Sequence, residues 1–89
     1  MTPTEIATQI KDLTQQLGQA MDGQRDDRGE VFLTLAEALT NIAQTIEHHA
    51  CDNPDIRVKR GAGAATEALR TASFHLTGVG VTITTRQAP

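Results

Sequence analysis

The chain has 89 residues, 38% of them hydrophobic, and its 8 basic and 11 acidic side chains give a net charge of −3. This length is enough for one small domain, residues 1–89, and excludes two. The weakly acidic balance excludes bulk attraction to nucleic acid, and no apolar run reaches the roughly 18 residues that a membrane-spanning helix requires.

The expected hydrophobic core is thin, because the chain has no Trp or Tyr and only two aromatic residues, Phe32 and Phe74. Domains somewhat shorter than this one rarely gain more than about 3–5 kcal/mol from their core, and disulfides, metals or oligomerisation commonly add the rest. Cys51 is the only cysteine, so an intrachain disulfide is excluded and a reducing cytoplasm is the expected location. We therefore expect a homo-oligomer, with a dimer as the simplest case.

The first predicted helix covers residues near 3–22. Thr2 can cap its free backbone amides, Pro3 suits the first helical position, and Glu5 completes a capping box. Gly23 is a typical residue to follow the last helical turn. Apolar residues recur at alternating steps of four and three, which places them on one face of the helix: Ile6, Ile10, Leu13, Leu17 and Ala20.

The second predicted helix covers residues near 28–51 and follows a polar connection at 22–29. Asp27 and Glu30 repeat the capping pattern at its start. Pro54 requires the helix to end before it, because proline lacks an amide donor and restricts the residue that precedes it. The four-and-three spacing recurs in its apolar residues: Phe32, Leu35, Leu39, Ile42 and Ile46.

The third predicted helix covers residues near 63–76. Its start is weakly marked because Gly61 and Gly63 have low helix propensity. Its apolar residues again share one face: Ala65, Leu69, Ala72 and Leu76. Three short amphipathic helices with short connections predict a mainly α fold, a three-helix antiparallel bundle.

Two segments beside the third helix are β-prone. Apolar residues alternate with basic residues at 56–59, and with glycine and threonine at 79–84, which is typical of short strands. The second segment could pair across a dimer, add to the sheet edge of a partner, or form a loosely packed tail. Residues 85–89 are expected to be a mobile tail.

The leading functional hypothesis is a non-enzymatic module for protein–protein interaction or oligomerisation. The apolar faces could form a helical bundle within one chain or a seam between chains, since the same spacing suits both. A thin core leaves apolar surface that a second copy or another protein partner could cover. The residues expected at such an interface are Ile6, Ile10, Leu13, Leu17, Phe32, Leu35, Leu39, Val79, Val81 and Ile83.

The alternative hypothesis is an accessory protein that binds nucleic acid or a phosphate ligand through a basic, glycine-flanked loop at 57–63. Three cations precede a helix start here, and free helix amides attract anions. The residues concerned are Arg57, Lys59, Arg60, Gly61 and Gly63. A nucleic-acid partner is not favoured, because the basic cluster is small and the chain is net acidic.

No metal, cofactor or catalytic group is predicted. His48 and Cys51 lie one helical turn apart, and His75 is the remaining soft donor, but a structural zinc site normally has four ligands in recognisable pairs. A histidine in the last turn of a helix is well explained by the free carbonyls there. Carboxylates that cap helices need no catalytic role, so an enzyme is not expected.

Overall fold

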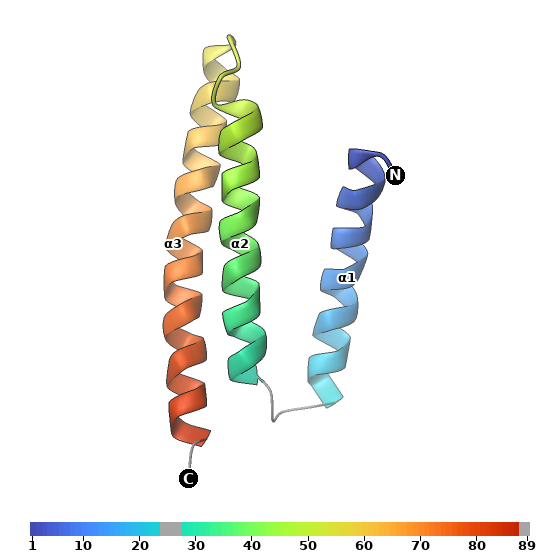
Figure 1. Ribbon diagram of the computed structural model, residues 1–89, viewed down its shortest axis with the longest axis vertical. Coiled ribbons are helices and arrows are strands. Elements are labelled where there is room, and N and C mark those ends of the chain that lie inside the picture. The colour runs from blue at the N-terminus through green and yellow to red at the C-terminus, as the bar shows by residue number, and fades with distance from the viewer. Residues whose placement is uncertain (24–27, 88–89) are drawn as a thin grey trace.

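The computed structural model describes residues 1–23 and 28–87, which form three α-helices and, within these ranges, no strand (Figure 1). Helix α1 spans Pro3–Gly23, α2 spans Arg28–Ala50 and α3 spans Ile56–Gln87. Consecutive helices run in opposite directions (Figure 1). The predicted mainly α fold is confirmed with three antiparallel helices, and the packing of α2 on α3 is compatible with the predicted three-helix bundle. The first two helices lie within one residue of their predicted bounds.

Short polar contacts define the helix ends. The amide of Glu5 donates to Oγ1 of Thr2 over 3.2 Å, as the capping box requires. Between α2 and α3, the amide of Asp55 donates to Oδ1 of Asn53, and the amide of Arg57 donates to Oδ1 of Asp55, both over 2.9 Å. The connection before Pro54 is thus a capped turn, and α3 begins seven residues earlier than the predicted residue 63.

The prediction of β-prone flanks is wrong, since 56–59 and 79–84 both belong to α3. Glycine and β-branched residues disfavour an isolated helix by at most about 1 kcal/mol each, and tertiary packing commonly outweighs this. Packing against α2 extends along α3 past Gly80, which is buried, to Thr84, whose backbone nitrogen would lie 3.1 Å from a Cβ built on Gly29. Of the predicted mobile tail, residues 85–87 lie in α3, and 88–89 lie outside the described residues.

Small residues form the contact between α2 and α3, which we call the seam. Ala43 has an exposed fraction of 0%. Gly29 and Gly80 lie opposite each other, and a Cβ built on Gly80 would be 2.9 Å from the carbonyl oxygen of Gly29 and 2.8 Å from Cγ of Leu33. Two helix backbones therefore approach each other closely at this end of the hairpin. The buried seam residues are Gly29, Ala36 and Ala43 of α2, and Ala62, Thr66, Ser73 and Gly80 of α3.

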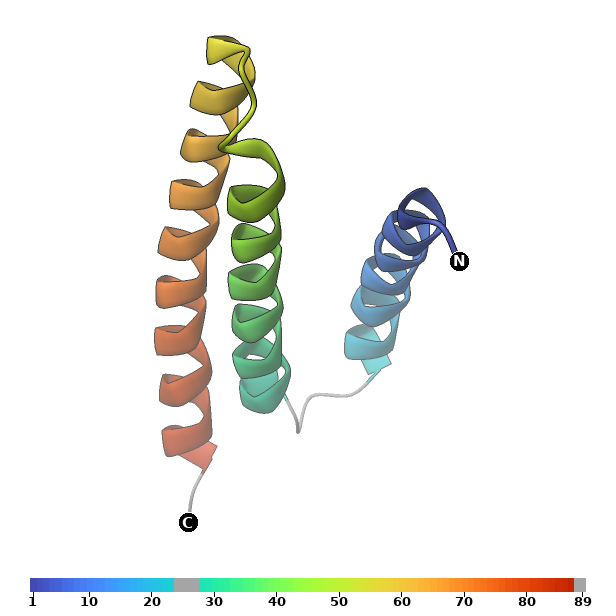
Figure 2. The same ribbon diagram turned by 45° about the horizontal axis from the view of Figure 1, so that its top comes forward.

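Helix α1 stands apart from this hairpin, on the side of α2 that faces away from α3 (Figures 1 and 2). Leu17, near its C-terminal end, borders a small pocket with Val31 and Leu35 of α2. Its N-terminal half is uncovered: Ile6, Ile10 and Leu13 are all exposed, Leu13 to 59%. No residue of α1 is buried in the part of the chain that the structure describes.

Candidate interaction surface

Large apolar side chains of α2 and α3 lie beside the seam rather than in it. An α-helix turns by about 100° per residue, so the apolar stripe of α2 is centred roughly 80° around the helix from the line through Gly29, Ala36 and Ala43. None of the large side chains in the described ranges is fully buried. We call this surface the apolar face; it comprises Phe32, Leu35, Leu39, Ile42 and Ile46 of α2, and Leu69, Leu76, Val79 and Ile83 of α3.

The two helices contribute to the same side of the hairpin. Viewed along each helix from its N-terminus, the apolar residues are displaced from the seam in the same rotational direction. Because α2 and α3 run in opposite directions, this displacement places the apolar residues of both helices on the same side of the hairpin. Most of these side chains are half-buried, whereas Ile42 is 36% and Val79 is 46% exposed. None of the described helices is both long and apolar enough to cross a membrane.

Charged side chains avoid the middle of the apolar face. Between Val31 and Ile46 of α2 the only charged residue is Glu37, and between residues 61 and 85 of α3 the only ones are Glu67 and Arg70. Helical geometry places all three on the opposite side of the hairpin. Alanine, threonine and histidine border most of the apolar face, and Arg28 and Arg86 lie at its end, where α2 begins and α3 ends. The middle of this surface can therefore be covered without removing charge from water.

The structure brings together five of the ten residues predicted for an interface. Phe32, Leu35 and Leu39 share the apolar face with Val79 and Ile83.

Val81 does not join them. A strand would have placed Val79, Val81 and Ile83 on one side. In a helix, residues two positions apart point about 200° away from each other, so Val81 lies on the opposite side of the hairpin with 51% exposure. The α1 residues Ile6, Ile10 and Leu13 form a separate exposed stripe, and Leu17 is partly buried near α2. The predicted residues therefore belong to two apolar surfaces, one on the hairpin and one on α1.

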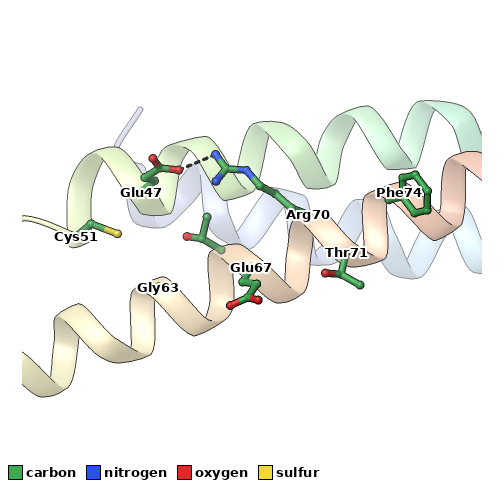
Figure 3. Close-up of a pocket in the computed structure, with 8 residues that line it drawn as sticks. Glu47, Cys51, Gly63, Glu67, Arg70, Thr71 and Phe74 are labelled. Carbon is green, nitrogen blue, oxygen red and sulfur yellow. Dashed lines mark hydrogen bonds and ion pairs between the residues drawn. The ribbon is translucent and has the colours of Figure 1, made fainter.

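The opposite side of the hairpin carries an open pocket of about 600 Å³ (Figure 3). One wall holds an ion pair of 2.6 Å between Arg70 and Glu47, both half-exposed. The ring of Phe74 is 75% exposed at this pocket. A half-exposed ion pair contributes only about 0.2–1 kcal/mol to stability. The lining residues are Glu47, Cys51, Gly63, Thr66, Glu67, Arg70, Thr71 and Phe74.

Hydroxyl groups lie at the middle of the seam. Oγ of Ser73 donates to the carbonyl oxygen of Ala36 over 2.7 Å and lies 2.9 Å from Oγ1 of Thr40. Oγ1 of Thr40 also donates to the carbonyl oxygen of Ala36, over 3.2 Å, so the two hydroxyls and this carbonyl form one network. Oγ1 of Thr66, in contrast, is buried without a hydrogen-bond partner in the structure. One hydroxyl thus joins the helices and another only fills space.

This difference predicts opposite effects for two identical substitutions. Thr66→Val should stabilise the fold by about 1 kcal/mol, because it removes a buried hydroxyl without a partner at nearly constant volume. Thr40→Val should destabilise it by about 1 kcal/mol, because it removes the hydrogen bond to Ser73. Urea unfolding followed by circular dichroism measures both, and equal effects of the same sign would contradict the assignment.

The basic residues predicted to form an anion-binding loop lie instead in a helix. Residues 57–63 are the first turns of α3, so the prediction of a loop is wrong. The carboxylate of Asp55 caps this end, and its Oδ1 also lies 3.7 Å from Nε of Arg57. Neither Gly61 nor Gly63 has a positive φ. Binding of nucleic acid or phosphate by Arg57, Lys59 and Arg60 stays a prediction.

The soft donor residues are spread over the hairpin. His48 and His49 end α2, with ring centroids 4.7 Å apart, and Cys51 follows in the turn. His75 packs edge-on against Phe74 in the middle of α3. Within the described ranges, no three His, Cys, Asp or Glu residues are grouped as a metal site would need.

Known proteins provide no guide to this surface. No protein family, curated protein or solved structure that was compared with the chain matches it. The function is therefore inferred from the chemistry of the chain's own residues.

The sequence reasoning missed the seam, although a signal for it was present. In α2, small residues recur every seven positions at Gly29, Ala36 and Ala43. In α3, Ser73 and Gly80 repeat the same interval. A seven-residue repeat returns to nearly the same side of a helix, so small residues at this interval indicate a face that another backbone can approach.

Proposed function

We propose that this chain is a non-enzymatic, cytoplasmic interaction module that self-associates, most simply as a dimer, with a second copy covering its apolar face. The observation that carries the proposal is the composition of its two helix faces. The buried residues of the seam are small (glycine, alanine, serine and threonine), and apart from Leu33, which packs against Gly80, the large apolar side chains lie beside it. Burial of apolar area is the main stabilising contribution in folding, and small residues provide little of it.

The exposed area supports this proposal. The chain exposes 6925 Å². A compact protein of 9.6 kDa exposes about 5,100 Å², so the excess is about 1,800 Å². A stable interface buries about 800 Å² of each partner. The radius of gyration, 15.6 Å, likewise exceeds the roughly 12 Å of a compact domain of this length. A second copy could therefore bury the area of a standard interface, and the chain would still expose as much surface as a compact protein of its size.

The chemistry of the apolar face fits a second copy as its partner. Most oligomers of soluble proteins are symmetric, so the same patch meets itself or a second patch of the same chain. Such contacts need matching, uncharged surfaces, because an unpaired buried charge is strongly unfavourable. Both apolar surfaces of this chain meet that need. On α1, the positions beside the stripe are also uncharged, including Ala7, Gln9, Thr14 and Gln16.

Substitution of Ile42 tests the proposal. Its side chain is 36% exposed on the apolar face and lies outside the seam. Ile42→Lys should therefore leave the hairpin folded and raise the dissociation constant of the dimer at least about tenfold, as measured by sedimentation equilibrium.

The matched control is Asn41→Lys, which adds the same charge one residue earlier, at an exposed position on the opposite side of α2. It should leave the dissociation constant unchanged, and circular dichroism should show equal helicity for both variants. A wild-type chain that stays monomeric at micromolar to millimolar concentration would refute self-association.

A further inference from the structure

Helix α1 has an apolar stripe that no part of the described chain covers over its N-terminal half, and the hairpin has an apolar face of similar length. We infer that α1 of each copy packs its stripe onto the apolar face of the other copy, so that two chains exchange their first helices. This inference rests on the proposed self-association and names the surfaces that meet.

The attachment of α1 favours exchange over closure onto its own hairpin. Leu17 lines a pocket with Val31 and Leu35 of α2, and α1 lies on the side of α2 that faces away from α3 (Figures 1 and 2). In this position α1 lies beside α2 alone and leans away from it toward its own N-terminus (Figures 1 and 2). The apolar face extends over both α2 and α3. Covering it within the same chain would require α1 to leave this side of α2, whereas covering the face of a second copy would not.

The apolar residues of the two surfaces are spaced alike. The stripe of α1 follows alternating steps of three and four, which is typical of a helix that packs along its partners through a narrow seam. The surface that it would cover is the apolar face, which α2 and α3 share and whose middle carries no charged residue. The charged residues in the middle of α1, Lys11 and Asp12, both lie more than 90° from its stripe and would remain in water.

A packing partner also explains the helicity of α1. An isolated helix of this length is marginally stable in water, and most helical stability in proteins comes from packing of an apolar face. Contact through Leu17 covers only its C-terminal end. Exchange would cover Ile6, Ile10 and Leu13 as well, and it would complete a three-helix core on each hairpin with residues of two chains.

Charge placed in the stripe is the first test. In full-length protein, Ile10→Lys should raise the dimer dissociation constant at least about tenfold, as Ile42→Lys does. Gln15→Lys adds the same charge on the opposite side of α1 and should have no effect. If Ile42→Lys weakens the dimer and Ile10→Lys does not, the hairpins pair directly; the inference is then wrong and the proposed function stands.

Cross-linking between single-cysteine chains is the second test. In a Cys51→Ala background, one chain carries Leu13→Cys on α1 and the other carries Ala72→Cys on the α3 side of the apolar face. Mixing and mild oxidation should give the mixed disulfide, identified by mass spectrometry, in excess over a Gln15→Cys and Ala72→Cys pair. Equal yields for the two pairs would overturn the inference.

A chain that carries both Leu13→Cys and Ala72→Cys separates exchange from closure. Exchange predicts a disulfide-linked dimer on oxidation at micromolar concentration. A monomer with an internal disulfide would show that α1 covers its own hairpin and would overturn the inference. If wild-type protein is a dimer in sedimentation, the internal disulfide refutes only the exchange of α1. If wild-type protein is a monomer as well, the proposed self-association is also refuted.

Discussion

Gly80→Ala is expected to destabilise the hairpin strongly, although alanine favours a helix more than glycine does. The new Cβ would lie 2.9 Å from the carbonyl oxygen of Gly29 and 2.8 Å from Cγ of Leu33. One of these neighbours is backbone, so the helices must move apart along the seam. Overpacking of this kind lowers the free energy of unfolding by about 1–3 kcal/mol, even after the roughly 1 kcal/mol that alanine contributes through its higher helix propensity.

Gly78→Ala is the matched control, two residues earlier in the same helix. A Cβ there would meet no atom within 4 Å. This variant should stabilise the protein by about 1 kcal/mol through helix propensity alone. At equal protein concentration, the melting temperatures of the two variants should differ by about 10 °C. A Gly80→Ala protein that melts at or above the wild type would contradict close packing of the backbones.

Ala43→Leu should have the second large effect, again by overpacking. The exposed fraction of Ala43 is 0%, and its side chain faces α3. Leucine adds three carbon atoms where no space exists, and the expected loss of unfolding free energy is about 3 kcal/mol. Helix propensity hardly changes between the two residues, so the loss would report on packing. The midpoint of urea unfolding measures it.

Gln44→Leu serves as the control for Ala43→Leu, because Gln44 is the next residue and is exposed. It adds a similar apolar side chain outside the seam and should change the unfolding free energy by less than about 0.5 kcal/mol. If both variants unfold at the same urea concentration, Ala43 does not lie in a close contact between α2 and α3.

These two variants and the interface variants probe different surfaces. Gly80 and Ala43 hold α2 against α3, so their substitution should lower the stability of each chain. Ile42 and Ile10 lie outside the seam, so their substitution should change association more than helicity. If a substitution of Ile42 or Ile10 unfolds the hairpin, these apolar surfaces are required for folding of the single chain. Association and folding would then be coupled.

The helix boundaries of α1 and α2 were predictable from local chemistry. The capping contact between Thr2 and Glu5 is present as expected, and Gly23 ends α1. Such signals act within a few residues, so they operate whatever the rest of the chain does. The same holds for the apolar stripes, whose spacing correctly indicated helices.

The extent of α3 was less predictable. Local propensity at 56–59 and 79–84 favours strands, yet both segments are helical because α3 packs along α2. Contact with a second helix can outweigh several weak local preferences, and a sequence window cannot register that contact. The same error placed Val81 with Val79 and Ile83, since strand and helix geometry differ in which residues share a side.

By itself, the sequence determined that the chain is helical, where its first two helices begin and end, and which residues form apolar stripes. Only the tertiary structure decided which face of each helix is buried. Periodicity identifies the side with the largest apolar residues, but α2 and α3 meet through glycine and alanine, because only small side chains allow backbones to approach so closely. The large residues were thereby left on the surface, where a second copy can reach them.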